Sequence, residues 1–119
     1  MKLGLMIIFV SDLEAAKRFY CDTLGFPLKA ERSDSIEFEH EGCEFKAFKC
    51  DENQTVKNYS RVARSVFVFK VDSLDKSFRD LREKGVTFLH ERPAENEFSR
   101  YVAFSDPFGN IHELYEPKN

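Results

Sequence analysis

The sequence predicts an α+β fold made of two tandem βαβββ modules, and three observations lead to it. Two helical patterns recur at a fixed spacing, since Leu13 and Leu74 near their starts are 61 residues apart, and Gly25 and Gly85 at their ends are 60 apart. Each helical pattern follows a strongly apolar strand pattern. Each glycine is followed by short strand patterns separated by turn residues. Such self-similarity is typical of a repeated structural unit.

Module one, about 1–50, begins with a strand over 3–10 that is apolar on both alternating faces, as in a strand covered on both sides. A helix follows, because Ser11 or Asp12 can cap its start and apolar residues recur at helical spacing as far as Gly25. Three further strands are expected, separated by polar turns. The first begins at about Leu28, the second spans 36–40 and the third spans 43–49.

A polar connector, about 51–64, leads to module two, about 65–117. The same plan recurs there, with a strand over 65–71 and a helix that begins after Asp72-Ser73. The remaining strands are expected at 86–90, 101–105 and 110–116, the last two joined by a turn at 106–109. The whole chain, 1–119, is therefore expected to be a single domain with an internal repeat.

Composition excludes several classes of function. The formal net charge is −3 and the sequence has no basic run, which argues against nucleic acid as a partner. The longest apolar stretch, 3–10, is too short to span a membrane, and we expect a cytoplasmic protein. The cysteines, Cys21, Cys43 and Cys50, form no CxxC pair and are expected to be reduced thiols.

Two motifs resemble a known family. The pattern Val10-Ser11-Asp12-Leu13, followed by Phe19-Tyr20 and Leu24-Gly25-Phe26, is similar to the opening of the vicinal oxygen chelate (VOC) superfamily. The segment Asp106-Pro107-Phe108-Gly109-Asn110, followed by Glu113-Leu114, resembles the turn and last strand of the same superfamily. Its members include glyoxalase I, extradiol dioxygenases, fosfomycin-resistance enzymes and bleomycin-resistance proteins.

The resemblance implies an architecture and a place for chemistry. The two modules would form a curved, eight-stranded sheet with a concave cup on one face and the helices outside, and homodimers would be common. In many members a divalent metal lies in the cup. One side chain from the first strand and one from the last strand of each module hold it, leaving open positions for adjacent substrate oxygens.

The four ligand positions that this resemblance implies are mostly filled by side chains that cannot bind a metal. They are Leu5 in the first strand, Lys46 or Ala47 in the last strand of module one, Val66 in the first strand of module two, and Glu113. Only Glu113 is a metal ligand, and Glu44 would need a shift in register. We therefore predict no cofactor, and keep a divalent metal at Glu113 as the alternative.

The same replacements predict an apolar cup with one polar group. If alternation turns the aliphatic residues of both first strands inward, they form the floor of the cup and Glu113 lies among them. Ile111 and Tyr115 flank Glu113 on the same face of the last strand. Arg100 could bind an anion at the rim, or could form a structural pair with Asp106 or another loop acid. The candidate ligand-binding residues are Leu5, Ile7, Val66, Val68, Arg100, Ile111, Glu113 and Tyr115.

Two functions remain open. The first is a metal-free protein of the bleomycin-resistance type that sequesters an apolar or planar small molecule. The second is a lyase, isomerase or oxygenase of the glyoxalase and dioxygenase type, with Glu113 as metal ligand or general base. Glu113 could also be a family residue held in a salt bridge, with Lys46, Lys70 or Arg100 as its partner. The segment 91–99 could be a lid or a solvated connector.

Overall fold

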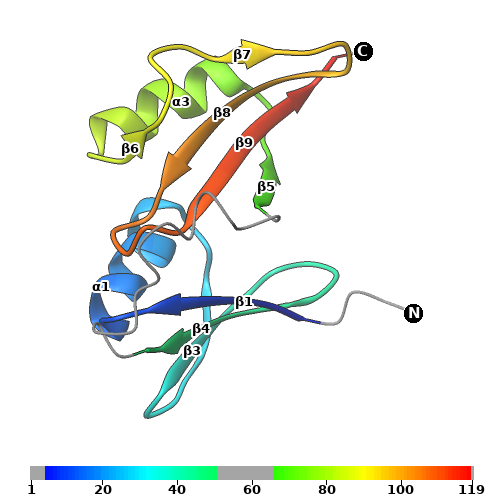
Figure 1. Ribbon diagram of the computed structural model, residues 1–119. Helices are drawn as coiled ribbons and strands as arrows, with labels where there is room; N and C mark the ends of the chain where they lie inside the picture. The colour runs from blue at the N-terminus through cyan, green and yellow to red at the C-terminus, as the bar shows by residue number, and fades with distance from the viewer. Residues whose placement is uncertain (1–4, 51–65, 119) are drawn as a thin grey trace. The chain divides into compact units, whose positions relative to one another are not determined.

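The computed structural model describes residues 5–50 and 66–118 (Figure 1). The chain divides into two compact units, Met1–Lys57 (unit 1) and Asn58–Asn119 (unit 2), and each is described by itself. The connector expected at about 51–64 lies outside the described residues. Within the described residues, no helix combines the length and the apolar character that crossing a membrane requires.

Unit 1 has the predicted βαβββ order. Its elements are β1 (Leu5–Val10), α1 (Leu13–Lys17), the π-helical turn η1 (Arg18–Thr23), β2 (Leu28–Glu31), β3 (Ser35–Phe38) and β4 (Glu44–Lys49). The strands form a four-stranded sheet in the order β1-β4-β3-β2. β1 runs parallel to β4, and the other neighbours are antiparallel. Asp12 caps the helix, because its Oδ1 accepts a hydrogen bond from the Ala15 N–H at 3.1 Å.

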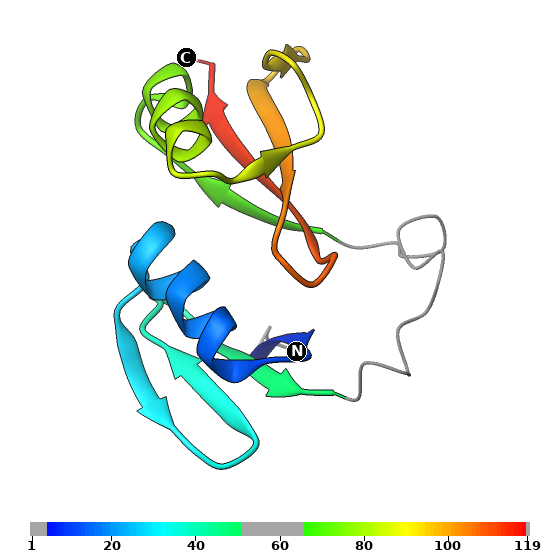
Figure 2. The ribbon, with the colours of Figure 1, turned by 90° about the vertical axis from the view of Figure 1, so that its left-hand side faces the viewer.

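Unit 2 repeats this topology. Its elements are β5 (Phe67–Lys70), α3 (Leu74–Glu83), β6 (Thr87–Phe88), β7 (Ala94–Glu95), β8 (Ser99–Ser105) and β9 (Ile111–Pro117). The strand order β5-β9-β8-β6 matches that of unit 1, and β5 runs parallel to β9 as β1 does to β4. Figure 2 shows each helical segment along one side of its own sheet. The repeat predicted from the sequence is confirmed.

The strand count of module two needs a correction. Three strands were expected after its helix, but the structure has four, because Ala94–Glu95 forms β7 and pairs with β8. β8 also begins at Ser99 rather than at Tyr101. The described residues therefore form two sheets, of four and five strands, in place of the eight strands expected. The reason is the turn at Asn96, which returns the chain to pair with β8.

Each sheet buries one face under its helical segment. In β1, Ile8 and Val10 are buried, whereas Leu5 and Ile7 on the other face are each 38% exposed. The helix supplies Tyr20, whose ring lies 5.2 Å from that of Phe38. We call the side of each sheet away from its helix the open face. Leu5 and Ile7 therefore share a face, as alternation predicts, but the expectation of a strand covered on both sides is wrong for β1, because the helical segment covers one face and leaves these side chains exposed.

His112 belongs to the buried face of unit 2. It is 1% exposed, and its ring lies 5.6 Å from that of Phe67 and 5.4 Å from that of Phe104. Desolvation by burial is the main cause that lowers the pKa of His112 from 6.5 to about 4, and the nearby Asp106 carboxylate opposes that change. His112 is thus neutral near pH 7 and acts as part of the aromatic core.

The buried histidine should make unit 2 less stable in mild acid. The unfolded chain takes up a proton at His112 near pH 6.5, and the folded chain takes it up only near pH 4. The free energy of unfolding should therefore fall as the pH drops between these values, by about 3 kcal/mol at this residue. Above that range the imidazole is neutral in both states, and stability should not change on its account.

Urea unfolding at pH 7 and at pH 4.5 measures this effect. His112→Phe, which keeps an aromatic ring in the core, should have a smaller difference between the two pH values than the unsubstituted protein. His40→Phe, at an exposed position of unit 1, is the control and should not alter the difference. If the difference in the free energy of unfolding between pH 7 and pH 4.5 is unchanged in His112→Phe, another titrating group causes the loss of stability in acid.

Candidate functional site

The open face of the sheet in unit 2 is centred on Glu113 of β9. Glu113 lies opposite Val68 of β5 on one side and opposite Ala103 of β8 on the other. One step along the same face, Tyr115 lies opposite Tyr101. Because side chains alternate along a strand, these residues share one face. Val68, Glu113 and Tyr115, three of the predicted ligand-binding residues, are thus brought together.

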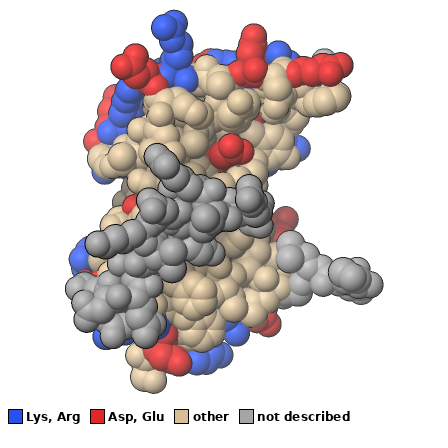
Figure 3. All heavy atoms as spheres, viewed as in Figure 1, with Lys and Arg blue, Asp and Glu red and all other residues tan. Residues whose placement is uncertain are grey.

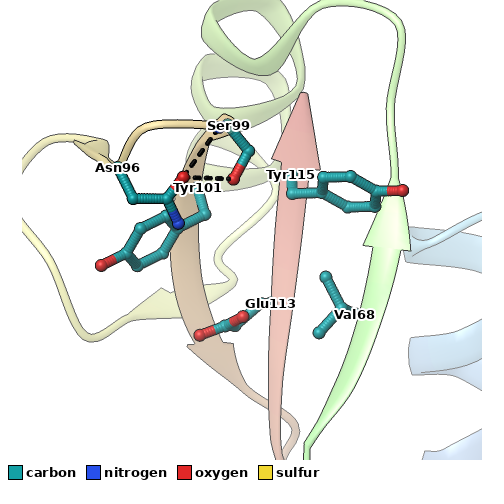
Figure 4. A pocket seen from close by; sticks show the side chains of 6 residues that line it. All are labelled: Val68, Asn96, Ser99, Tyr101, Glu113 and Tyr115. Atoms are coloured by element: carbon teal, nitrogen blue, oxygen red, sulfur yellow. Dashed lines mark hydrogen bonds between the residues drawn. The ribbon is translucent and has the colours of Figure 1, made fainter. Parts of the chain in front are cut away.

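A hollow of about 240 Å³ lies on this face (Figure 4). Six residues line it: Val68, Asn96, Ser99, Tyr101, Glu113 and Tyr115. In Figure 4 the side chains of Tyr101 and Tyr115 extend in opposite directions, with Glu113 between and below them. In the upper half of Figure 3, one acidic side chain lies among uncharged side chains, and most other charged side chains lie toward the edges. The lining therefore combines two tyrosine rings and one valine with an amide, a hydroxyl and one carboxylate.

Asn96 and Ser99 were not among the predicted site residues. They close the turn between β7 and β8, where Asn96 Oδ1 accepts hydrogen bonds from the backbone N–H of Phe98 and of Ser99, each at 2.8 Å. The same oxygen accepts a bond from Ser99 Oγ at 3.3 Å. None of these bonds uses the amide nitrogen of Asn96, which lies beside Tyr101 in Figure 4. The segment expected to be a lid or a connector is therefore in part a paired hairpin.

Tyr101 was also missed, and the structure shows what positions its ring. The ring of His90 meets it edge-on, with centroids 6.2 Å apart. His90 in turn accepts a hydrogen bond from the Ala103 N–H at Nδ1, at 3.3 Å, and so continues the pairing of β6 with β8. The sequence alone does not place Tyr101 on this face, because it depends on the register between β8 and β9, which sets Tyr101 opposite Tyr115.

Glu113 is half-buried and has no counter-ion within the described residues. Among the residues that the structure describes, no hydrogen bond or ion pair joins its carboxylate. Of its three candidate partners, Lys46 pairs with Glu44 at 3.2 Å in unit 1. Lys70 lies opposite Tyr115 rather than Glu113 and does not line the hollow.

Arg100, the third candidate, lies on the opposite face from Glu113. It alternates with Tyr101 along β8, so its side chain turns toward α3. Its guanidinium donates two hydrogen bonds to Asp75, at 2.9 and 3.1 Å, and these hold the pKa of Asp75 below its usual range. The structural pair therefore forms with a helix residue and not with Asp106, which caps the turn 106–110. The structure does not bring Arg100 to the candidate site.

The internal repeat relates positions in the two open faces. Lys46 lies opposite Ile7 in β1 as Glu113 lies opposite Val68 in β5, so Lys46 is the counterpart of Glu113. Of the two positions considered in β4, Lys46 is therefore on the open face, and Ala47 is buried. Leu5 and Val66 lie at the exposed starts of the corresponding first strands.

These residues do not fit the metal site that the fold family implies. The Leu5 and Val66 side chains have no lone pair, and Lys46 carries a positive charge, so Glu113 is the one ligand among the four positions. Within residues 5–50 and 66–118, no group of three or more His, Cys, Asp or Glu side chains could hold a metal ion.

The sequence matches the Glyoxalase/Bleomycin resistance protein/Dioxygenase superfamily over residues 2–114. The chain belongs to this superfamily. It is 31% identical over 126 residues to the uncharacterized protein YraH of Bacillus subtilis (strain 168), a match that covers 98% of each chain. The resemblance found in the two sequence motifs is thereby confirmed.

Solved structures of the superfamily share the fold. TnmS3, an antibiotic binding protein from Streptomyces sp. CB03234, is 27% identical, with a TM-score of 0.73 over 99% of this chain and 97% of its own. A glyoxalase family protein from Enterococcus faecalis is 25% identical, with a TM-score of 0.79 over 97% of each chain. Lactoylglutathione lyase from Agrobacterium tumefaciens, at 20% identity and a TM-score of 0.72 over 96% of this chain and 92% of its own, is similar in fold.

The hydrogen bonds of Asn96 should be what holds the rim of the hollow. Asn96→Ala removes the acceptor of the Phe98 and Ser99 amides, so these amides should exchange about tenfold faster with solvent deuterium. Asn96→Asp keeps an acceptor oxygen and should restore slow exchange. Exchange followed by NMR tests this, and equal rates in all three proteins would show that the backbone alone holds the turn.

Proposed function

We propose that this protein binds a small planar molecule on the open face of unit 2 and sequesters it without changing it chemically. The observation that supports this most strongly is the hollow around Glu113, where one carboxylate lies among Val68, Tyr101 and Tyr115. A concavity in which aromatic and aliphatic side chains lie beside placed hydrogen-bonding groups is a usual form of a small-molecule site, and Asn96 and Ser99 add such groups here. The proposal includes the homodimer and the cytoplasmic location that the sequence analysis expects.

The size of the hollow limits what it can hold. Small-molecule sites usually have volumes of about 300–1,000 Å³, and this one is close to 240 Å³. It therefore suits a single or fused ring system, or one ring-bearing end of a larger molecule. Tyrosine rings provide broad, rigid contact surfaces for such ligands at a small cost in side-chain entropy.

The relatives are compatible with this function. TnmS3 is an antibiotic binding protein and is 27% identical over nearly the whole chain. The side chains at the implied metal-ligand positions also favour a metal-free site, since Leu5, Lys46 and Val66 cannot assist Glu113 in holding a metal. A catalyst of the glyoxalase type would in this chain have to work without three of the four metal ligands that the family resemblance implies.

An enzyme that uses Glu113 as a general base is the second candidate. The observation in its favour is that the half-buried carboxylate has no ion pair among the described residues, and so could accept a proton. Loss of a general base usually lowers a rate by about a hundredfold to ten-thousandfold. A turnover that is unchanged in Glu113→Gln would exclude this role.

Binding of a neutral planar probe tests the first function. N-Phenyl-1-naphthylamine should bind with increased fluorescence, and Tyr101→Ala and Tyr115→Ala should each weaken the affinity about tenfold, because each removes an aromatic wall. Phe19→Ala removes a partly exposed aromatic residue of the helical segment of unit 1, away from both open faces, and is the control. Equal weakening by the control, or no weakening by either tyrosine variant, would contradict the proposed site. The probe should be recovered chemically unchanged.

Metal titration tests the other half of the proposal. Protein purified without chelator should contain no stoichiometric metal, and added Ni²⁺, Zn²⁺, Mn²⁺ or Fe²⁺ should not bind tightly, because one carboxylate is a weak site. Calorimetry and elemental analysis provide the measurement. Tight binding of one ion per chain that is lost in Glu113→Gln would contradict the metal-free site.

A further inference from the structure

We propose that the ligand of this hollow is an organic cation, with an ammonium or amidinium group at Glu113 and a planar ring against Tyr101 and Tyr115. This inference rests on the proposed function and narrows the ligand to one chemical class. Three independent features of the described residues support it: the missing counter-ion of Glu113, the aromatic walls beside it, and the polarity of the rim.

The open face of unit 1 provides a comparison, because its charged side chains have partners of opposite charge. In unit 1, Lys46, the counterpart of Glu113, has Glu44 at 3.2 Å. Glu37, in the neighbouring strand, has Lys29 and Arg32 each at 3.9 Å. In the described part of unit 2, Glu113 has no such partner. A half-buried carboxylate loses part of its hydration, and a cationic ligand would supply the charge that the protein does not.

The surroundings of Glu113 suit a cation with an apolar body. The face of an aromatic ring attracts a positive charge, and Tyr101 and Tyr115 lie on either side of the carboxylate (Figure 4). Val68, directly opposite Glu113 in the register, provides an aliphatic surface for the uncharged part of the ligand. The edge contact from His90 holds the Tyr101 ring in place before the ligand arrives.

The rim decides the orientation of the ligand. Asn96 Oδ1 is already used by the turn, which leaves the amide nitrogen, a hydrogen-bond donor, on the side of Tyr101. A donor there favours an acceptor atom on the ligand. The positive end of the ligand therefore belongs at Glu113, and any carbonyl or ether oxygen at Asn96. Lys70, the cation on the same face, lies opposite Tyr115 and does not line the hollow.

Three naphthalene probes of nearly equal size test the charge requirement. They are 1-naphthylmethylammonium, the neutral 1-naphthylmethanol and the anionic 1-naphthoate, each titrated into the full-length protein and followed by NMR of the tyrosine rings. The ammonium should bind at least about tenfold more tightly than the alcohol, and the carboxylate more weakly than either. The preference for the ammonium should decrease as salt is added.

Matched variants separate a local contact from the overall charge. Glu113→Gln, close to isosteric, should weaken ammonium binding about tenfold and leave alcohol binding unchanged, which also shows that the variant is folded. Glu83→Gln, at an exposed position of α3, changes the net charge equally and should leave both affinities unchanged. An equal loss in Glu83→Gln would mean that long-range charge is responsible, and would overturn the inference.

The remaining outcomes distinguish this inference from the proposed function. If the alcohol binds as tightly as the ammonium, and both are weakened by Tyr115→Ala, the site binds planar molecules but the cation inference is wrong. If none of the three probes binds, the proposed function fails and the inference fails with it.

Discussion

The constraint on which the rest of the structure depends is that each sheet is covered by a helix on one face only. Along β9, His112 and Leu114 turn toward α3 and are 1% and 4% exposed, whereas Glu113 between them turns to the open face. A shift of one residue in register would place the carboxylate of Glu113 under the helix and the imidazole of His112 in the hollow. Burying an unpaired carboxylate is costly, so the register of β9 is strongly fixed.

Comparison of the two units shows which features they share and which differ. Both units have the same strand order and parallel first and last strands, and the covered faces are built from large apolar side chains. The open faces have diverged, since Lys46 in unit 1 corresponds to Glu113 in unit 2. A substitution on an open face does not disturb packing under the helix, so it can change binding at little cost in stability.

Local signals in the sequence predicted most of the fold and part of the site. Neighbours in the chain decide the glycines after each helix and the alternation of β9, and both were predicted. They also decide the helix cap, which was predicted at Ser11 or Asp12 and lies at Asp12. The family resemblance singled out Glu113, and alternation along the strands then placed Val68 and Tyr115 on the same face. Alternation along β8 turns Arg100 and Tyr101 to opposite faces, so Arg100, although predicted as a ligand-binding residue, lies away from the hollow.

The residues that were missed depend on contacts between distant segments. β7 is two residues long, too short for a pattern, and exists because β8 offers it a partner. Asn96 faces the hollow only because its own oxygen closes the turn that makes this pairing possible. Side-chain hydrogen bonds of this kind have no periodicity, and a sequence search for strands and helices does not find them.

His112 and Glu113 show how one strand can serve both stability and binding. The histidine loses its charge, since burial among aromatic rings lowers its pKa to about 4, and the core gains a ring. The glutamate, one residue later, keeps access to the hollow. Because the covered face alone holds each unit together, the open face is available for different chemistry. An antibiotic binding protein and a lactoylglutathione lyase are both similar to this chain in fold, so the fold does not decide its function, which has to be argued from the residues around Glu113.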